Sequence, residues 1–434
     1  MDKMTEVLSK VGVWCGQNKY LTAIKNAFQT FLPLTISGAM GVLWCNVLVN
    51  AETGLGNLWK PIMALEFLNP AFEAINFASI SCITIAITFG IAQEIGLWNL
   101  GYEKCGYFPG ILGLACWISV TEFAPVLKTG DVFKCIPSSA LGATGLFTGM
   151  IIGVLSTEIF CKLNAIDQLK IKMPDMVPPG VARSFETLVP AFLTFITVSL
   201  LGLACRGLTG LYLNDVISTF VQKPLAGIGA SLPGILTIYL VAQLFWLVGI
   251  HGASMTHGVR EAIFTPLLLE NTEAYLNGKT PPNIANMVSL QMFGELGGSG
   301  VTLGLVIAIL IFGKREDNRT IASLSLVPGI FNINETVTFG IPLVLNPILG
   351  IPFVIAPLVT QAIGYILTAI GVCPPIVIQV PWTTPPVLQG FLATGGQIMG
   401  AVTQLIVLVA SLLIYVPFVI AYEKYQNKQS EIVD

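Results

Sequence analysis

Charged side chains are scarce in this chain. Asp, Glu, Lys and Arg together make up 10% of its 434 residues, whereas hydrophobic residues make up 54%. Soluble domains contain about a quarter charged residues, so the shortage excludes a soluble globular protein and indicates a polytopic membrane protein. The net charge of −3 comes without a large basic patch, and nucleic acid is therefore excluded as an expected partner.

Motifs for nucleotide or metal chemistry are also absent. The sequence contains no Walker A, GxSxG or HExxH motif, so ATP is not expected to be the direct energy source. The nine cysteines form no CxxC pair and no metal-type spacing, and those within apolar runs, such as Cys116 and Cys161, are expected to be small buried hydrophobic residues. Neither a metal nor another cofactor is predicted.

Long apolar runs make up most of the chain instead. A helix needs about 20 apolar residues to cross a bilayer, and the runs predict an all-α integral membrane protein with about ten transmembrane helices. Residues 1–27 and 210–230 are amphipathic and are predicted to lie at the membrane interface. The predicted spans are residues 28–49, 73–92, 106–124, 139–161, 185–205, 231–250, 298–313, 350–371 and 398–421, with a further broken segment at 320–347.

Two stretches of the second half are too polar and too rich in proline for ordinary spans. They are residues 251–297 and 328–352, and each is predicted to form a broken, re-entrant hairpin. Interrupted hydrophobic segments of a transporter indicate its binding site, because freed backbone groups and helix ends face the ligand. The chain is therefore predicted to divide into an N-terminal helical domain (1–209) for packing or oligomer contacts, a connector (210–230) and a substrate-binding domain (231–434).

Clusters of Lys and Arg predict the side of the membrane on which each loop lies. The N-terminal arm, the 162–183 loop, the 314–319 loop and the C-terminal end carry such clusters, and all four are assigned to the cytoplasmic side. The four spans before the 162–183 loop agree with that assignment. Between residues 183 and 314, the cytoplasmic assignment requires that the segment 251–297 crosses the membrane once more.

Glu335 is the one charged side chain between Thr320 and Tyr422. An unpaired carboxylate is costly to bury in hydrocarbon. A polar break at membrane depth is tolerated only where it is buried in protein or lines a watery cavity. Glu335 lies in such a break, after Pro328, and is the leading candidate for a functional residue, with a structural ion pair as the alternative.

The chain has two histidines, His251 and His257, and both follow a strongly apolar span. Their spacing of six residues matches neither i,i+3 nor i,i+4, so a shared metal is not predicted. His251 is predicted at a helix end, either in the site or as a satisfied helix-end residue. His257 lies beside Arg260, which indicates a solvated edge as an equal alternative. Glu295 lies in a Gly-rich break, as a site carboxylate or as a helix-terminal one bonded to backbone amides.

The QVPWTTPP loop begins at Gln379 and contains Trp382. Trp382 is either an interfacial anchor or a flat platform for the apolar face of a sugar ring, with Gln379 and Thr383 as hydrogen-bond partners. Ser138 opens an earlier span and is a further candidate for the cavity, although a helix cap is the simpler interpretation.

Three motifs connect the chain with a known family. The WLVGIHG stretch (246–252), the NINETVTFGIPLVLNP stretch (332–347) and the PWTTPP loop resemble the membrane permease subunit (enzyme IIC) of the bacterial sugar phosphotransferase system, in its lactose, cellobiose and diacetylchitobiose branch. The resemblance covers nearly the whole chain and adds Trp246 to the sugar-binding candidates. It implies a transport subunit rather than an enzyme, located in the bacterial cytoplasmic membrane as a homodimer of ten-helix protomers.

The family also implies roles for single residues. By resemblance, Glu335 and His251 lie at the C6 hydroxyl of a disaccharide, the group that receives phosphate, with Glu335 as proton acceptor and His251 as orienting partner. Asn332 and Asn334 are expected to hold sugar hydroxyls, and Glu295 to bind the distal ring or its N-acetyl group. The phosphoryl donor is expected to be a phosphocysteine on a separate cytoplasmic IIB protein, with a IIA protein upstream.

Two other functions are compatible with the residues. A proton-coupled secondary sugar transporter would use Glu335 as its titrating group and move the sugar unmodified. An integral-membrane enzyme acting on a lipid-linked sugar would need a second acid or a metal site near Glu335, and the sequence shows no clear one.

Overall fold

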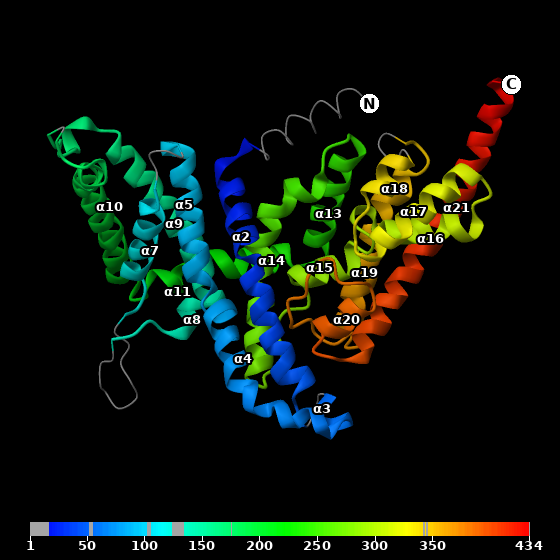
Figure 1. The fold of residues 1–434 in the computed structure, drawn as a ribbon, viewed down its shortest axis with the longest axis horizontal. Coiled ribbons are helices and arrows are strands. Elements are labelled where there is room, and N and C mark those ends of the chain that lie inside the picture. Colours follow the sequence, from blue (N-terminus) through cyan, green and yellow to red (C-terminus); the bar gives the residue numbers. More distant parts are fainter. Residues whose placement is uncertain are drawn as a thin grey trace. The chain divides into compact units, whose positions relative to one another are not determined.

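Helices are the only regular elements in the part of the chain that the computed structural model describes, as the apolar runs predict (Figure 1). The surface helix predicted for residues 1–27 lies largely outside the described residues. Its last part is included, and from Lys19 onward it forms the start of α2 (Lys19–Leu43). The described residues are 17–51, 55–101, 106–123, 134–174, 176–341, 343 and 346–433.

The described chain forms two compact units, which are not two halves of the sequence. Residues 17–38 and 74–226 form the first, which we name the 74–226 unit. Residues 39–73 pack with residues 227–433 in the second, which we name the 227–433 unit. The functional roles predicted for the two parts of the chain stay predictions.

Small residues bring the central helices of the 74–226 unit close together. α5 (Ile83–Leu100) packs against α9 (Ala143–Asn164), where a Cβ on Gly149 would lie 2.2 Å from the Thr88 hydroxyl. Close backbone approach is how apolar helices associate in lipid, where burial of apolar surface gives little driving force. α10 (Pro179–Thr209) packs on α9 but leaves most of its residues exposed within the unit.

Shorter elements complete this unit. The span predicted at 73–92 begins later, at Ile83, because the preceding residues form α4 and a π-helix. The predicted connector is a series of three short helices, α11, η5 and α12. The short elements are η3 (Phe77–Ser81), α7 (Phe108–Val120), α8 (Ser138–Leu141), η4 (Asp167–Leu169), α11 (Leu213–Ile217) and η5 (Ser218–Gln222), and two more, α4 (Asn69–Asn76) and α12 (Lys223–Gly229), contribute residues to both units.

The 227–433 unit contains helices interrupted by Gly- and Pro-rich turns. α14 (Gly252–Leu276) is a continuous helix of 25 residues, although the sequence predicted a broken segment there. It is followed by a non-helical turn and α15 (Met287–Gly294). The other elements are η1 (Trp44–Leu48), α3 (Leu55–Leu58), η2 (Lys60–Leu68), α13 (Leu232–Leu247), η6 (Ser299–Val301), α16 (Thr302–Phe312), α17 (Glu316–Ile330), α18 (Glu335–Gly340), α19 (Gly350–Ala369), α20 (Leu388–Ala393) and α21 (Ile398–Val433).

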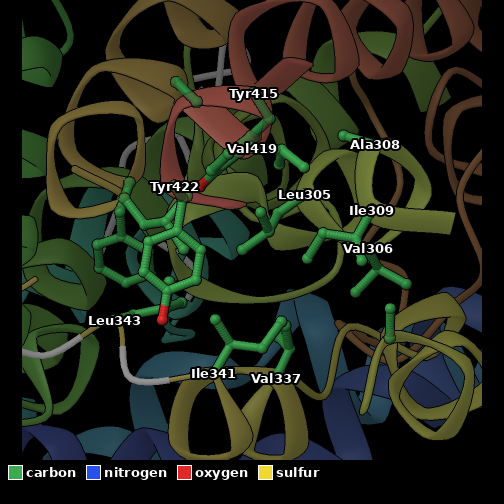
Figure 2. Packing of buried hydrophobic residues seen from close by; sticks show 14 of the residues in the cluster. Leu305, Val306, Ala308, Ile309, Val337, Ile341, Leu343, Tyr415, Val419 and Tyr422 are labelled. Atoms are coloured by element: carbon green, nitrogen blue, oxygen red, sulfur yellow. The ribbon is translucent and has the colours of Figure 1, made fainter. Parts of the chain in front are cut away.

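An apolar core joins α16, α18, α19 and α21 within this unit. Figure 2 shows Leu305 of α16, Val337 of α18 and Val419 of α21 among the side chains that fill it. Tyr415 is fully buried there, and its hydroxyl donates a hydrogen bond to the Gly300 carbonyl at 2.6 Å. The core therefore also fixes the turn that precedes α16.

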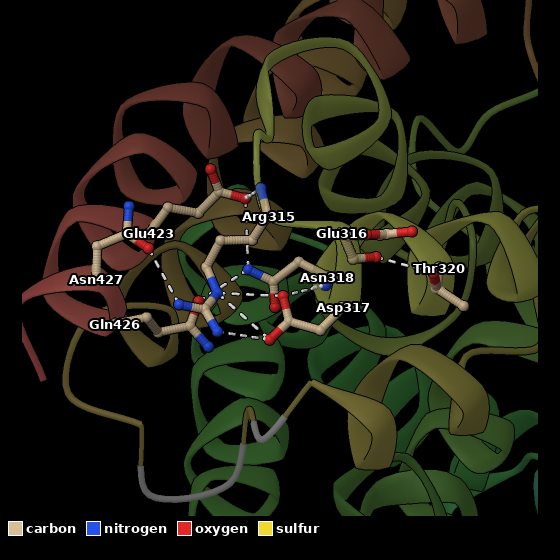
Figure 3. A network of polar contacts seen from close by, with 8 residues as sticks. All are labelled: Arg315, Glu316, Asp317, Asn318, Thr320, Glu423, Gln426 and Asn427. Carbon is tan, nitrogen blue, oxygen red and sulfur yellow. Dashed lines mark hydrogen bonds and ion pairs between the residues drawn. The ribbon is translucent and has the colours of Figure 1, made fainter. Parts of the chain in front are cut away.

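A polar clamp joins the loop before α17 to the last turns of α21 (Figure 3). The buried Glu423 carboxylate accepts hydrogen bonds from the backbone N–H groups of Lys314 (2.7 Å) and Arg315 (3.2 Å). The Arg315 guanidinium donates to Asp317 (2.8 Å) and to Asn427 (3.0 Å). The hydrogen bond from Arg315 holds the pKa of Asp317 below its usual value. The loop and the end of α21 are thereby held on the same side of the unit.

Seven helical stretches of the described chain are long and apolar enough to cross a membrane, which confirms a multi-pass membrane protein. The stretches 213–229 and 232–247 supply an eighth if they act as one broken span, and α7 is shorter, at 13 residues. The count of about ten helices and the two re-entrant hairpins stay predictions. The seven are Lys19–Leu48, Ile83–Leu100, Ala143–Asn164, Pro179–Thr209, Met287–Phe312, Gly350–Ala369 and Ile398–Lys428.

Candidate functional site

One cavity of about 500 Å³ in the 227–433 unit collects most of the residues that the sequence singles out. Its volume lies within the range of ~300–1,000 Å³ that is typical of small-molecule sites. The walls come from the first turns of α14, from α15 and from three non-helical segments near residues 298, 333 and 382. Polar side chains in the lining include His251, His257, Arg260, Glu295, Asn332, Asn334 and Glu335, with Trp382 beside them.

A tight corner between α13 and α14 positions His251. α13 ends at Leu247, and Gly249 then adopts a left-handed conformation with φ 83°. Gly252 begins α14 so close to α13 that a Cβ there would lie 1.8 Å from the Ala242 carbonyl oxygen. These two glycines let the WLVGIHG motif reverse the chain, with His251 at the corner.

His251 caps α14 with its own ring. Its Nδ1 accepts a hydrogen bond from the Ser254 backbone N–H (3.2 Å) and lies 3.0 Å from the Ser254 hydroxyl. Nδ1 must therefore carry a lone pair, so a neutral ring holds its proton on Nε2. Trp246 packs beside the imidazole, with 4.5 Å between the ring centroids. Because His251 also lines the cavity, it occupies a helix end and a place in the cavity wall at the same time.

Glu335 begins α18 directly after the break at residues 331–334. Its side chain is exposed and lines the same cavity as His251. Within the described ranges its carboxylate makes no ion pair and no hydrogen bond. The structural ion pair that the sequence left open is therefore not observed there, and the carboxylate can meet a polar ligand directly.

Asn332 joins three separate segments of the cavity wall. Its φ of 61° is left-handed, a conformation that Asn adopts more readily than most residues. The side-chain oxygen accepts a hydrogen bond from the Gly297 N–H (2.8 Å), and the amide nitrogen donates to the carbonyls of Trp382 (2.6 Å) and Thr384 (3.3 Å). Since both ends of the amide bond to backbone groups, Asn332 braces the wall of the cavity.

Asn334 ties α18 to the turn before α16. Its amide nitrogen donates to the Ser299 carbonyl (2.8 Å), and a Cβ on Gly298 would lie 2.7 Å from its Cγ. Gly298 has φ 90°, so its conformation and its neighbour both require glycine. The Gly-rich segment after Glu295 and the NINET segment therefore fit against each other, although they are 35 residues apart in sequence.

Glu295 directly follows α15 as its C-cap, and the buried Arg260 pairs with it. Arg260 is only 4% exposed, and its Nη2 lies 2.6 Å from the Glu295 Oε1 atom. The guanidinium carbon also lies 5.5 Å from the centroid of the Tyr239 ring, which is a cation–π distance. The solvated edge that the sequence left open as an alternative for His257 was inferred from Arg260, and Arg260 is instead buried, because α14 continues as a regular helix and turns this residue into the unit.

Sequence reasoning missed Arg260, although a helical spacing marks it. Ala253, His257 and Arg260 follow one another at i, i+4 and i+7, and all three line the cavity. The polar residues and prolines of 251–297 predicted a broken segment, in which a helical spacing is not expected. His257 also lies 3.7 Å from the Glu261 carboxylate on the next turn.

Three further candidates lie outside the cavity lining. Trp246 is 4% exposed and supports the His251 ring from behind. Gln379 is partly buried, with its amide nitrogen 3.4 Å from the Val380 carbonyl. Ser138 begins α8 in the 74–226 unit.

Known families and proteins match this chain along most of its length. The family model described as "Phosphotransferase system, EIIC" matches residues 25–357. The oligo-beta-mannoside-specific EIIC component of Bacillus subtilis (strain 168) is 34% identical over 427 residues, which cover 98% of this chain and 94% of that protein. The cellobiose-specific EIIC component of Lactococcus lactis subsp. lactis (strain IL1403) is 30% identical, and the match covers 98% of each chain.

A solved structure is similar to this one over nearly its full length. It is the crystal structure of the transporter ChbC, the IIC component from the N,N'-diacetylchitobiose-specific phosphotransferase system. The two chains are 31% identical, the match covers 98% of each, and the TM-score is 0.88.

Proposed function

Because this chain belongs to the EIIC family of the phosphotransferase system, as its motifs predicted, we propose that it carries a β-linked disaccharide across the membrane and presents the sugar for phosphorylation at its C6 hydroxyl. The family makes it the membrane subunit of a multi-component transport system. One observation carries the finer proposal: His251 and Glu335 line a single cavity, and within the described residues the Glu335 carboxylate has no partner.

The proposed reaction is the transfer of a phosphoryl group from a cysteine sulfur to a sugar oxygen. The C6 oxygen attacks phosphorus, the P–O bond forms, the P–S bond breaks, and the cysteine leaves as a thiolate. In this proposal Glu335 accepts the hydroxyl proton, and the His251 Nε2–H donates a hydrogen bond that orients the C6 oxygen. The free Glu335 carboxylate and the occupied His251 Nδ1 support these two roles.

The relatives support a β-linked sugar as the substrate. Their names give oligo-β-mannoside, cellobiose and N,N'-diacetylchitobiose, all of which are β-linked. We infer that Trp382, whose side chain is 46% exposed, stacks on the apolar face of one ring. Glu295 accepts hydrogen bonds from the distal ring, while Asn334 and His257 complete the polar contacts.

The proposal includes partners that approach from the cytoplasm. A IIB protein that carries a phosphocysteine, itself loaded by a IIA protein, supplies the phosphoryl group. The chain works as a homodimer in a bacterial cytoplasmic membrane, with its N-terminal part as the dimer contact. The many exposed apolar residues of α10 support this contact, since a second protomer would cover them.

Reconstituted vesicles test the proposed function. Protein in liposomes is given radiolabelled cellobiose or diacetylchitobiose, with and without phosphorylated IIB on the side of the 314–319 loop. We expect 6-phospho-sugar to accumulate only when IIB is present. Concentrative uptake of unmodified sugar, driven by a pH gradient and without IIB, would overturn the proposal in favour of a proton-coupled transporter.

A further inference from the structure

The Arg260–Glu295 pair is the one contact in the cavity wall between permanently charged groups of opposite sign, within the described residues. We propose that Arg260 is a positioning residue that holds the Glu295 carboxylate in place and compensates its charge. Glu335 then remains the uncompensated carboxylate of the cavity. This inference deepens the proposed function and relies on it only where a sugar serves as the readout.

The two carboxylates of the cavity have different surroundings. Glu295 lies 2.6 Å from a guanidinium, whereas Glu335 has no ion-pair partner in the ranges that the structure describes. Arg260 is also the only Lys or Arg among the described lining residues. A carboxylate that is paired with arginine stays an acceptor of hydrogen bonds, while an unpaired carboxylate is free to take a proton. The pairing therefore separates a binding role from a proton-transfer role.

Arg260 packs against a side chain of a buried polar network. Its guanidinium lies against the Tyr239 ring, and the Tyr239 hydroxyl donates to the Leu290 carbonyl at 2.6 Å. The Gln361 amide of α19 donates to the same carbonyl at 2.7 Å. The Tyr239 side chain against which Arg260 packs is thus held in place by α15, and the same carbonyl of α15 is bonded to α19.

The backbone beside Glu295 is held equally firmly. A Cβ on Gly294 would lie 2.5 Å from Tyr239 Cζ and 2.7 Å from the Gln361 amide nitrogen. The last residue of α15 is therefore packed directly on the Tyr239 and Gln361 side chains of that network. Both partners of the ion pair have a defined place before any ligand arrives, which reduces the ordering cost of binding.

A double-mutant cycle tests the inference. The variants are Arg260→Met, Glu295→Gln and the pair combined, and affinity for radiolabelled cellobiose and diacetylchitobiose is measured on purified protein. Arg260→Met leaves Glu295 uncompensated, so we expect affinity to fall about tenfold or more. The combined variant should bind better than Arg260→Met, because residue 295 then carries no uncompensated charge. If the affinity losses of the two single variants simply multiply in the combined variant, the two residues act independently and the inference is overturned.

Kinetics and stability supply readouts that separate positioning from other roles. With IIB and excess sugar, Arg260→Met should raise KM and leave kcat near the wild-type value, because Glu335 and His251 are intact. The midpoint of thermal unfolding should fall for Arg260→Met and recover in the combined variant, which needs no sugar. If the midpoint of thermal unfolding stays low in the combined variant, the pairing of Arg260 with Glu295 is contradicted.

Two controls complete the design. Arg319→Met removes an arginine that bonds to the Leu310 and Gly313 carbonyls outside the cavity lining, and it should leave sugar affinity unchanged. Arg260→Lys keeps the charge and should retain more affinity than Arg260→Met. Wild-type protein that binds neither sugar would refute the proposed function, whereas normal wild-type binding with affinity unaffected by Arg260→Met would refute the role of Arg260.

Discussion

At the scale of single residues, His251 combines a structural and a chemical position in one ring. Nδ1 caps α14, and the neutral ring then has its proton on Nε2, on a residue that lines the cavity. The cap and the proposed contact with the sugar use different atoms of one side chain, so they can be separated by substitution.

The first prediction separates the two positions of His251. His251→Ala should lose the cap, at about 1 kcal/mol, and should also weaken sugar binding. His251→Asn keeps a side chain that caps helices well but removes Nε2. We therefore expect Asn to restore the midpoint of thermal unfolding in detergent and not the affinity for cellobiose in a binding titration. Affinity that returns with Asn would mean that the ring serves only as a cap.

The second prediction concerns Glu335. Glu335→Gln keeps the size and hydrogen-bonding ability of the side chain but cannot accept a proton. The rate of 6-phospho-sugar formation with IIB should fall by about 10²–10⁴-fold, as for the loss of a general base, while sugar affinity is largely retained. Glu316→Gln, at the exposed start of α17, is the matched control. Wild-type phosphorylation by Glu335→Gln would refute the base role.

At the scale of elements, the cavity is formed by interruptions between helices, and Asn332 holds these interruptions together. Its side chain reaches Gly297 on one side and Trp382 and Thr384 on the other. The predicted role of Asn332 as a ligand for sugar hydroxyls stays untested. Its observed bonds hold the backbone of the loop that carries Trp382.

The third prediction tests this brace. Asn332→Gly tolerates the left-handed backbone and removes only the side chain, so the backbone partners lose their hydrogen bonds, at about 1–3 kcal/mol for each buried group left unpaired. Amide hydrogen exchange measured by mass spectrometry should become faster in residues 381–386, and sugar affinity should fall. Asn277→Ala, at the exposed end of α14, is the control. Unchanged exchange in 381–386 would show that the loop does not depend on Asn332.

Much of the element pattern was predictable, and its failures have a physical cause. Apolar runs predicted the long helices well, because a bilayer imposes one length and one composition on them. The prediction failed at α14, where Pro266 and acidic residues suggested breaks that the helix does not have. Arg260 was missed for the same reason, and the pairing of Arg260 with Glu295 depends on packing between α14 and α15 that no local pattern encodes. Glu335 was singled out because a lone carboxylate is anomalous in any apolar segment, and it lines the cavity.

At the scale of the whole molecule, two contacts connect the clusters of positive charge. Within the 227–433 unit, the Arg315 guanidinium bonds to Asn427 at 3.0 Å, so the 314–319 loop and the C-terminal end lie on one side (Figure 3). Within the 74–226 unit, Lys19 pairs with Glu158 at 2.5 Å, which brings the start of α2 to the end of α9, just before the 162–183 loop. Each contact joins two clusters that the sequence assigned to the same side.

The fourth prediction is that all four clusters face the cytoplasm. Lys and Arg in short loops are retained on that side during insertion. The two contacts require that the two clusters joined by each contact lie on the same side of the membrane. In a cysteine-free background, single cysteines at Glu316 and Lys170, both outside the cavity lining, are tested with a membrane-impermeant maleimide. Both should react in inside-out vesicles and neither in right-side-out vesicles or intact cells. If a cysteine at position 316 reacts from outside, the assignment of the C-terminal end is reversed as well, because Glu423 of α21 is bonded to the backbone of the 314–319 loop.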